Sequence, residues 1–570
     1  MTVVSDRLEF TLDDQLVVVA YAPGETLLTV LRERLGVTSV KDGCAPQGQC
    51  GCCTVLVDGD PRVACVTPAA RIAGREVRTV ATVPGATDLA EKLCATGGAQ
   101  CGFCTPGIIV RLAAKQPTSD VAIDRALAGH LCRCTGWETI REALRDVAID
   151  PERDWDAAAE RAQLELGAPQ RVGVDIALGH GAFADDSAPR DALVAVPLPP
   201  GSDAPFVEVA GARWVVGATL AEARERAGKI QGRATTQAVR PPIGIAWTPT
   251  GGVGLSTSWT EPAYLEPDAS WCAPDGTPAP VRGNGGAFGG KRDAIAADVA
   301  HALADAYGEP VRVVYAREDV VRTRPKRPPI AAIAHWEAGT VHLMGQVVLD
   351  ASSYDAWMTR RAWSYAGVTV EEEWDTVSVP GPTTSMALRA SGLAERTVLI
   401  CGALHAAGQA IQPADEREGQ VLLDTLAGVP ESGALAGARV HTNAGGRING
   451  VDVRVAAGDP LDWSVLRSYA IGAAHAALSW VTSEGIAVDP SSGEILDLTI
   501  RSFGVLRPKD TPCIDVTVVE DSGAPRARSS DAVFSAVAAA AWNAIADATG
   551  QRPMAFPTGV LPVRETEDTV

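Results

Sequence analysis

Two groups of four cysteines in the first quarter of the chain constrain its fold more than any other feature. In the first group, a glycine-rich loop supplies three cysteines and a fourth follows further along the chain. Its members are Cys44, Cys50, Cys53 and Cys65. The second group pairs a C-x2-C turn with a C-x-C turn: Cys101, Cys104, Cys132 and Cys134. Three thiolates from one loop plus a distant fourth are typical of plant-type ferredoxins, so the sequence predicts two [2Fe-2S] clusters.

A zinc-binding scaffold is the alternative for these cysteines, because tetrahedral sulfur ligation also suits Zn²⁺. The glycine-rich loop and the C-x-C pair are unusual for zinc and favour iron–sulfur ligation. Cys52 and Cys53 are adjacent, and only one of them is expected to be a ligand. The C-x2-C spacing from Cys50 selects Cys53.

Composition limits the partners and the compartment of the chain. The 570 residues include 50 basic and 70 acidic side chains, for a net charge of -20, which argues against binding nucleic acid or an anionic membrane. The first residues do not resemble a targeting segment, and from the sequence we expect no apolar run long enough to span a bilayer. We therefore expect a cytoplasmic protein. In that reducing compartment, closely spaced cysteines indicate metal ligation rather than disulfides.

The alternation of apolar residues predicts an α+β protein of several domains. Short strands around the Asp58-Gly59 turn suggest a β-grasp ferredoxin unit, and helical spacing follows from about Asp88. Beyond the cysteines come an acidic stretch, either a helix or a solvated linker, and a long region of mixed signals. The predicted divisions are 1–80 (β-grasp ferredoxin), 81–150 (helical [2Fe-2S] domain), 151–170 (linker), 171–345 and 346–570 (two mixed α/β parts).

The segments QCGFCTPGIIV, LCRCTGW and CGCCTVLVDG together resemble the two-cluster iron–sulfur module of the xanthine dehydrogenase and aldehyde oxidase family of molybdenum hydroxylases. GGAFGGK at 285–291 and RVGVDIALGHGAFADD resemble parts of the molybdenum subunit of that family. The resemblance implies that the first quartet holds the cluster remote from molybdenum and the second quartet the cluster nearer the pterin. One departure is local: five residues separate Cys44 from Cys50, where the family usually has four.

The resemblance also implies residues that would bind a molybdopterin cofactor. Gln100 matches the family glutamine that hydrogen-bonds the pterin. Gly285, Gly286, Phe288 and Gly289 belong to the glycine-rich loop. With little side-chain bulk, such a loop lets backbone N–H groups approach an anionic or oxo ligand, although a plain tight turn has the same composition.

Two further residues correspond to catalytic positions of the family. Arg389 lies where the family has an arginine–glycine loop near the substrate, and a surface arginine is the alternative. Asp531 stands where the family places a glutamate that activates a molybdenum-bound hydroxide. Asp531 is one methylene shorter, and its alternative role is a helix cap. A metal-facing glutamine and the second pterin loop of the family have no clear match, which indicates large internal deletions.

Three functional interpretations remain open. The favoured one is an iron–sulfur electron-transfer component of a molybdenum hydroxylase system, with the second half as a structural relic. The others are a complete, compact molybdopterin-dependent hydroxylase of an N-heterocycle or aldehyde, and the zinc scaffold. The expected partners are a molybdopterin-binding catalytic subunit and a FAD-binding subunit, because no dinucleotide fingerprint follows a strand at the junction near residue 170.

Overall fold

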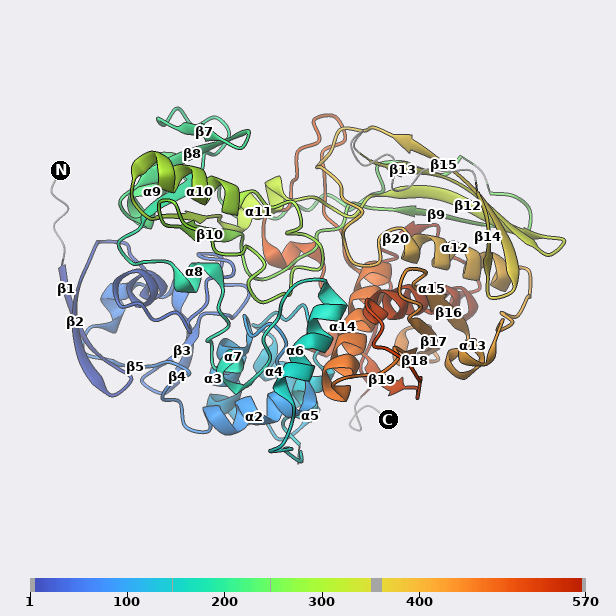
Figure 1. The fold of residues 1–570 in the computed structure, drawn as a ribbon, viewed down its shortest axis with the longest axis horizontal. Helices are drawn as coiled ribbons and strands as arrows, with labels where there is room; N and C mark the ends of the chain where they lie inside the picture. The colour runs from blue at the N-terminus through green and yellow to red at the C-terminus, as the bar shows by residue number, and fades with distance from the viewer. Residues whose placement is uncertain (1–5, 146, 247, 350–360, 566–570) are drawn as a thin grey trace.

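The computed structural model of the chain describes residues 6–145, 147–246, 248–349 and 361–565. The strands within these residues form four sheets, which alternate with helices along the chain (Figure 1). The predicted α+β class is therefore confirmed. The β-grasp unit lies at one end of the molecule and the third of the four sheets at the other (Figure 1).

The first sheet has the strand order β2-β1-β5-β3-β4. Its strands are β1 (Asp6–Leu12), β2 (Gln15–Tyr21), β3 (Thr54–Val57), β4 (Asp60–Val63) and β5 (Glu76–Arg78). Helix α1 (Leu27–Thr29) continues as a π-helical turn, Val30–Arg34. Asp58 and Gly59 both have positive φ, 50° and 81°, as a two-residue type I′ hairpin requires. The predicted hairpin is therefore confirmed, and it returns the chain to the cysteine loop.

A small helical unit follows the first sheet. Its helices are α2 (Ala86–Thr96), α3 (Thr105–Lys115), α4 (Asp120–Leu127) and α5 (Glu138–Glu142). Pro106 lies in the first turn of α3, where its missing N–H costs no hydrogen bond. Ser119 caps α4 by accepting a hydrogen bond from the Ala122 N–H. These helices confirm the helical spacing predicted for this part of the sequence.

The acidic stretch at 151–170, expected as a linker or a helix, contains helix α6 (Trp155–Leu166). This helix packs its alanines against helix α14. Its Arg161 and Glu165 side chains are 0% exposed and form an ion pair of 2.6 Å. Part of the charge run is therefore buried, because the two charges neutralise each other inside the protein.

The second sheet has the strand order β10-β11-β6-β8-β7 and lies above the helical unit in Figure 1. Its strands are β6 (Leu193–Pro197), β7 (Val207–Val209), β8 (Ala212–Gly217), β10 (Ala269–Cys272) and β11 (Val311–Val314). Helices α9 (Leu220–Ala227) and α10 (Ala296–Tyr307) pack on it. Two short helices, α8 (Ala184–Ser187) and α11 (Arg317–Thr323), belong to this part of the chain, whereas the short helix α7 (Val174–Ala177) packs on α2 of the helical unit.

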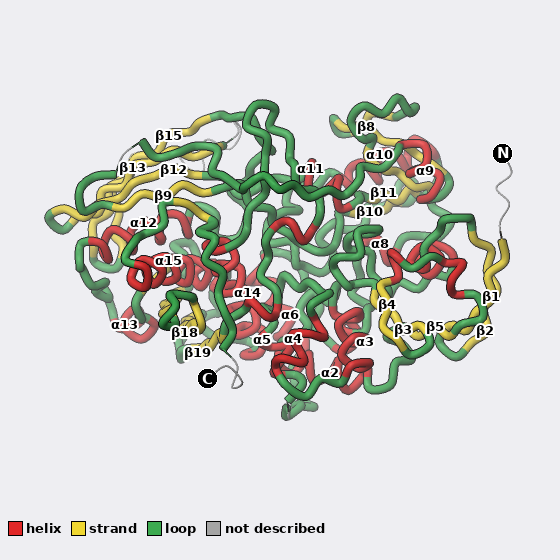
Figure 2. Tube along the Cα trace, turned by 180° about the vertical axis from the view of Figure 1, so that it is seen from behind, coloured by secondary structure: helices red, strands yellow, loops and turns green. Residues whose placement is uncertain are grey.

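The third and fourth sheets enclose a layer of long helices, seen from behind in Figure 2. The third sheet contains β9 (Val253–Thr257), β12 (Ile330–Glu337), β13 (Thr340–Val348), β14 (Arg361–Tyr365), β15 (Val368–Val377) and β20 (Ala555–Phe556). The fourth contains β16 (Thr425–Gly428), β17 (Leu435–Thr442), β18 (Ile448–Ala456) and β19 (Cys513–Val518). The predicted division at residue 345 falls within β13, and the third sheet takes strands from both sides of it.

The helices of this half are α12 (Leu393–Ala406), α13 (Glu416–Val421), α14 (Trp463–Thr482) and α15 (Ser529–Thr549). Helix α12 covers the third sheet, α15 packs between α12 and the fourth sheet, and α14 packs beside α15. Helix α15 is long and apolar enough to cross a membrane, contrary to the sequence prediction. However, 72% of its most apolar window is buried within the protein, so it forms the core of this half.

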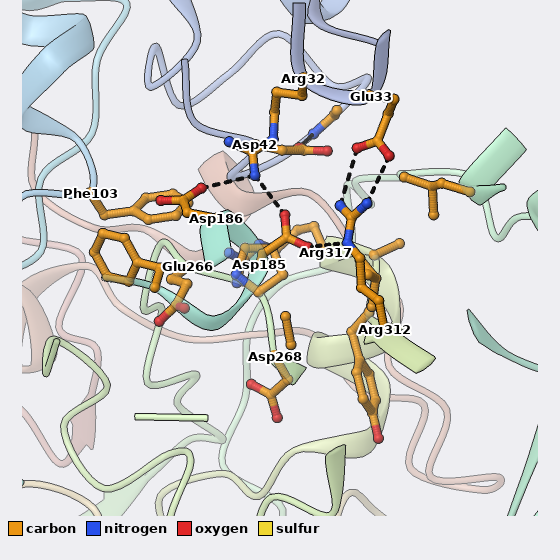
Figure 3. Close-up of a pocket in the computed structure, with 18 of the residues that line it drawn as sticks. Arg32, Glu33, Asp42, Phe103, Asp185, Asp186, Glu266, Asp268, Arg312 and Arg317 are labelled. Carbon is orange, nitrogen blue, oxygen red and sulfur yellow. Dashed lines mark hydrogen bonds and ion pairs between the residues drawn. The ribbon is translucent and has the colours of Figure 1, made fainter. Parts of the chain in front are cut away.

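Buried ion pairs fix the β-grasp unit against the second sheet (Figure 3). Arg32 contacts Asp185 at 2.7 Å and Asp186 at 2.9 Å. Arg312 bridges Asp185 and Glu33, both at 2.7 Å. The cavity among these side chains measures only about 30 Å³, so the network seals the interface rather than binding a ligand.

Candidate functional site

The first cysteine quartet lies in the loop before β3 and in the short 3-10 helix Ala64–Val66 that follows β4. All four side chains are at most 2% exposed. The Cys44 sulfur lies within hydrogen-bonding reach of Cys50 and Cys65, and Cys65 also reaches Cys53. Hydrogen bonds from the Cys50 and Cys65 thiols hold the pKa of Cys44 well below its usual value. The hairpin at Asp58-Gly59 thus brings the distant fourth cysteine to the other three.

Backbone N–H groups point at the sulfurs of this quartet. The N–H groups of Gln49 and Cys50 lie 3.4 and 3.3 Å from the Cys44 sulfur. The Cys65 N–H lies 3.4 Å from the Cys53 sulfur. Such hydrogen bonds favour the thiolate form and tune the potential of an iron–sulfur cluster. The donor set therefore fits a [2Fe-2S] cluster.

Cys52 differs from its neighbours in this loop. It is 1% exposed, and its thiol faces the Cys50 carbonyl oxygen at 3.9 Å. It also lies close enough to Cys104, in the second quartet, to help raise the pKa of that thiol, after the larger effects of the Cys132 hydrogen bond and burial. Cys52 therefore lies on the side of the loop that faces the second quartet.

The second quartet lies at the ends of helices. Cys101 and Cys104 precede α3, with Cys104 as its N-cap residue, while Cys132 and Cys134 lie in the turn between α4 and α5. The sulfurs of Cys101 and Cys134 are 3.8 Å apart. A hydrogen bond from the Cys104 thiol lowers the pKa of Cys132 to about 6. The four buried sulfurs form a second thiolate set suited to a [2Fe-2S] cluster.

His130 connects the loops of the two quartets, a role that sequence reasoning missed. Its Nε2 lies 3.2 Å from both the Thr54 hydroxyl and the Gly107 carbonyl oxygen. Because Thr54 donates its own proton to Gly51, Nε2 of His130 is the donor in both contacts. Burial lowers the pKa of His130 to about 4, so the ring is neutral. Its position directly before the LCRC segment was the only sequence signal.

Gln100 is buried beside the second quartet, and its amide nitrogen forms hydrogen bonds within the protein. Its Nε2 donates to the Cys134 carbonyl oxygen at 3.0 Å and to the Ser468 hydroxyl of α14 at 2.8 Å. Ser468 in turn donates to the Gly97 carbonyl oxygen. A Cβ on Gly472 of α14 would lie 1.8 Å from the Cys134 carbonyl oxygen, so this helix packs directly on the quartet.

The glycine-rich loop at 285–290 touches the second quartet on one side. Gly285, Gly286, Phe288 and Gly289 all have positive φ, between 50° and 88°. A Cβ on Gly286 would lie 3.1 Å from the Cys101 sulfur, and one on Gly289 would clash with the Ala387 carbonyl oxygen at 1.9 Å. The loop therefore needs glycine for close packing as well as for its backbone conformation.

A cavity of about 200 Å³ brings six of the predicted residues together. Its lining includes Gly285, Gly286, Phe288, Gly289, Arg389 and Asp531. Gln100 does not line it. The Arg389 guanidinium stacks on the Phe288 ring, 4.3 Å from its centroid. Burial lowers the pKa of Arg389 and raises that of Asp531.

Asp531 is held by charged neighbours at the N-terminus of α15. Its carboxylate accepts two contacts from Arg528, at 2.6 and 2.7 Å. The helix cap that the sequence suggested at Asp531 comes instead from Glu165 of α6, which accepts hydrogen bonds from the Ser529 hydroxyl and from the Ser530 N–H. The start of α15 is therefore fixed by α6, which no local motif indicated.

The residues around this cavity do not fit a molybdopterin. A cofactor of that size needs a pocket of about 300–1,000 Å³, which exceeds the available 200 Å³. The amide nitrogen of Gln100 already donates to the Cys134 carbonyl oxygen and the Ser468 hydroxyl. A larger cavity of about 810 Å³ lies beyond Met386 and Arg528, but of the predicted site residues it includes none.

Comparisons with known proteins agree with the two thiolate sets. Residues 10–77 match the family described as 2Fe-2S iron-sulfur cluster binding domain, and residues 78–145 match the [2Fe-2S] binding domain. The chain is 41% identical over 134 residues to the nicotinate dehydrogenase small FeS subunit of Eubacterium barkeri, covering 22% of this chain and 82% of that protein. It is also 41% identical over 133 residues to the xanthine dehydrogenase iron-sulfur-binding subunit of Escherichia coli O157:H7, with the same coverage.

The fold of nearly the whole chain is similar to that of two solved structures. The aldehyde oxidoreductase from Desulfovibrio gigas aligns over 97% of this chain and 99% of its own, with a TM-score of 0.71 and 15% identity. The aldehyde oxidoreductase from Desulfovibrio desulfuricans aligns over 98% and 100%, with a TM-score of 0.72 and the same identity. At this identity the likeness concerns the fold alone.

Proposed function

We propose, for a chain that belongs to the xanthine dehydrogenase and aldehyde oxidase family of molybdenum hydroxylases, a role in electron transfer. Its two thiolate sets carry electrons between a separate catalytic subunit and a further acceptor. It is an iron–sulfur component of such an oxidoreductase system, with two [2Fe-2S]-binding domains. The single observation that carries the proposal is the convergence of eight buried cysteine sulfurs into two groups of four.

The ligands of the first cluster are Cys44, Cys50, Cys53 and Cys65, and those of the second are Cys101, Cys104, Cys132 and Cys134. The N–H groups directed at Cys44 and Cys53 support this assignment for the first set. The 3.8 Å contact between Cys101 and Cys134 supports it for the second. When bound, each [2Fe-2S] cluster accepts and releases one electron at a time.

A short connection supports direct electron transfer between the two sets. The Leu131 N–H donates to the Cys50 carbonyl oxygen at 3.0 Å, and Leu131 precedes the ligand Cys132 in the chain. His130 and Gly107 hold the two loops against each other around this contact. One hydrogen bond therefore joins the backbone of one ligand loop to that of the other.

Electrons leave from the first set in this proposal. Val66, directly after the ligand Cys65, is 52% exposed, so this set lies just below the surface. A FAD-binding subunit is the acceptor that we propose at this surface. The second set is covered by the glycine-rich loop and by α14.

Substrate oxidation takes place outside this chain. The cavity around Arg389 and Asp531 is too small for molybdopterin. The carboxylate of Asp531 already forms an ion pair with Arg528. The relatives named as small FeS subunits support a separate molybdopterin-binding partner. The reducing cytoplasm suits the protein, since all thirteen cysteines are free of disulfides.

One observation favours the compact hydroxylase as a second candidate. Six residues that the resemblance implied, spread between Gly285 and Asp531, line one cavity next to the second thiolate set. In that case this cavity would open to admit the cofactor, and Arg389 and Asp531 would face the substrate.

Metal analysis of the anaerobically purified protein tests the proposal. We expect about four iron atoms and four labile sulfides per chain, no molybdenum, and no oxidation of aldehydes or purines. Molybdenum near one atom per chain, with turnover that is lost in Asp531→Asn, would establish the compact hydroxylase instead. Stoichiometric zinc without sulfide would establish the scaffold.

A further inference from the structure

Two histidines lie side by side on the outer face of the third sheet, far in sequence from any cysteine ligand. His335 on β12 and His342 on β13 are directly opposite in the antiparallel register. Helix α12 lies against one face of this sheet (Figure 1). Ala334 and Val341, which directly precede the two histidines, are buried in the core on that face. Because side chains alternate along a strand, the histidines point to the opposite face. Each is about one-third exposed.

The geometry of the pair brings nitrogen and oxygen donors together. The two imidazole rings stack with centroids 5.1 Å apart and an interplanar angle of 23°. Glu337 follows on the same face of β12, with its Oε2 3.7 Å from Nε2 of His335. One ligand atom from each of these three residues lies within 4.8 Å of the other two.

We propose that His335, Glu337 and His342 bind one divalent transition-metal ion of the zinc class. Two ligands of a tetrahedral Zn²⁺ ion lie about 3.3 Å apart, given metal–ligand distances of about 2.0–2.2 Å. Small rotations of these exposed side chains reach that spacing. Imidazole and carboxylate donors suit Zn²⁺, Ni²⁺ and Cu²⁺ more than Mg²⁺ or Ca²⁺, and water fills the fourth position.

Glu371 on the neighbouring strand β15 contacts His342 without being a ligand itself. It pairs with His342 in the parallel register, and its Oε2 lies 3.3 Å from Nδ1 of His342. A carboxylate at one imidazole nitrogen places the proton there and leaves Nε2 free as a metal ligand. The ion would thus join β12 to β13 and, through Glu371, to β15.

The charge of this surface favours a cation. Strands β12, β13 and β15 contain no lysine or arginine. Glu371, Glu373 and Asp375 alternate along the exposed face of β15, and Glu337 is exposed at the end of β12. A cross-strand histidine–glutamate pair alone would stabilise the sheet slightly. Such a pair does not explain why two imidazole rings stack with their ligand atoms, and that of Glu337, close to one another.

Titration of the cluster-loaded protein with Zn²⁺ by calorimetry tests the site, since the loaded clusters occupy the cysteine ligands. We expect one Zn²⁺ per chain. Glu371→Gln should weaken binding by about 10–100-fold, and His335→Ala or His342→Ala by more. The matched control is His441→Ala, because His441 is an exposed histidine paired with Asp452 at 2.7 Å on the fourth sheet. This control should bind Zn²⁺ like the wild type.

Titration with Co²⁺ identifies the donor atoms. Nitrogen and oxygen ligation gives visible d–d bands without the near-ultraviolet charge-transfer band of a thiolate. A thiolate band, unchanged affinity in the histidine variants, or an equal loss in His441→Ala would overturn the proposal. An unchanged urea midpoint by tryptophan fluorescence verifies the fold of each variant, and Glu337→Gln removes a ligand without shortening a strand side chain.

Discussion

The cluster-bearing region, residues 6–145, and the long region from 171 to 565 differ in what they share with known proteins. The first is 41% identical to named iron–sulfur subunits, and its eight candidate ligands are all in place and buried. The likeness to aldehyde oxidoreductases, which extends over 97% of the chain and so includes the second region, is one of fold, at 15% identity over the whole alignment. Its glycine loop is present, but the cavity behind it is small and the Asp531 carboxylate is bound by Arg528.

This difference shows that a fold and a reaction depend on different residues. Packing of α12, α14 and α15 between two sheets needs only apolar side chains of suitable size, and many sequences provide them. A cluster needs four thiolates at fixed positions, and losing one of them removes the cofactor. The first region therefore retains its chemistry residue by residue, whereas the second can lose its chemistry and keep its architecture.

The largest expected effect separates the two thiolate sets within the first region. Cys53→Ser should abolish the first cluster and leave the second, because Cys53 contacts Cys65 and no member of the second set. Cys134→Ser should do the reverse. Iron content should fall from about four to about two per chain. Paramagnetic resonance of the reduced variants checks this, and the loss of both signals from one substitution would contradict the assignment.

A substitution in α6 tests whether the second region is held by packing rather than by a cofactor. Glu165→Ala leaves Arg161 as a buried, unpaired charge and removes the cap of α15. We expect the free energy of unfolding to fall by about 3–5 kcal/mol, with both cluster signals retained in the folded protein. Urea unfolding followed by tryptophan fluorescence measures it, and Glu160→Ala, which changes an exposed glutamate of the same helix, serves for comparison. An unchanged midpoint in Glu165→Ala would show that the pair contributes little.

The pH dependence of stability gives a smaller effect in the same region. Burial lowers the pKa of His475 in α14 from 6.5 to about 3, so the folded protein keeps this ring neutral while the unfolded chain protonates it. Stability from this group is therefore complete above pH 6.5 and is lost as the pH falls toward 3. Between pH 7 and pH 5 the loss should be about 2 kcal/mol.

His475→Gln should remove this part of the pH dependence, and the exposed His441→Ala should retain it. Urea midpoints at pH 7, 6 and 5 provide the measurement. Equal slopes in the wild type and His475→Gln would show that other groups account for the acid sensitivity.

The smallest effect concerns Cys52, which lies between the two sets but is not a proposed ligand. Cys52→Ala should retain both clusters and about four iron atoms per chain, and should cost about 1 kcal/mol of stability from the lost buried sulfur. Iron analysis and paramagnetic resonance check it. Loss of the first signal in Cys52→Ala together with its retention in Cys53→Ser would reverse the choice between these neighbours.

Short-range patterns in the sequence predicted the first region well. The Asp58-Gly59 turn, the strands beside it and the helices around the second quartet follow from local spacing and turn chemistry, and the structure confirms them. The stretch at 151–170 was harder to interpret. Its acidic composition suggested solvent exposure, but Arg161 and Glu165 pair in the interior.

The sequence by itself determined the two cysteine quartets, because each cluster motif lies within a few dozen residues and its spacing encodes its geometry. Only the tertiary structure decided that Arg389 and Asp531 line one small cavity together with the glycine loop. It also decided that the amide nitrogen of Gln100 donates a hydrogen bond to Ser468. It also decided that His335 and His342 meet across two strands. These contacts join separate strands, helices and loops, so they depend on how the elements pack, which residue spacing does not specify.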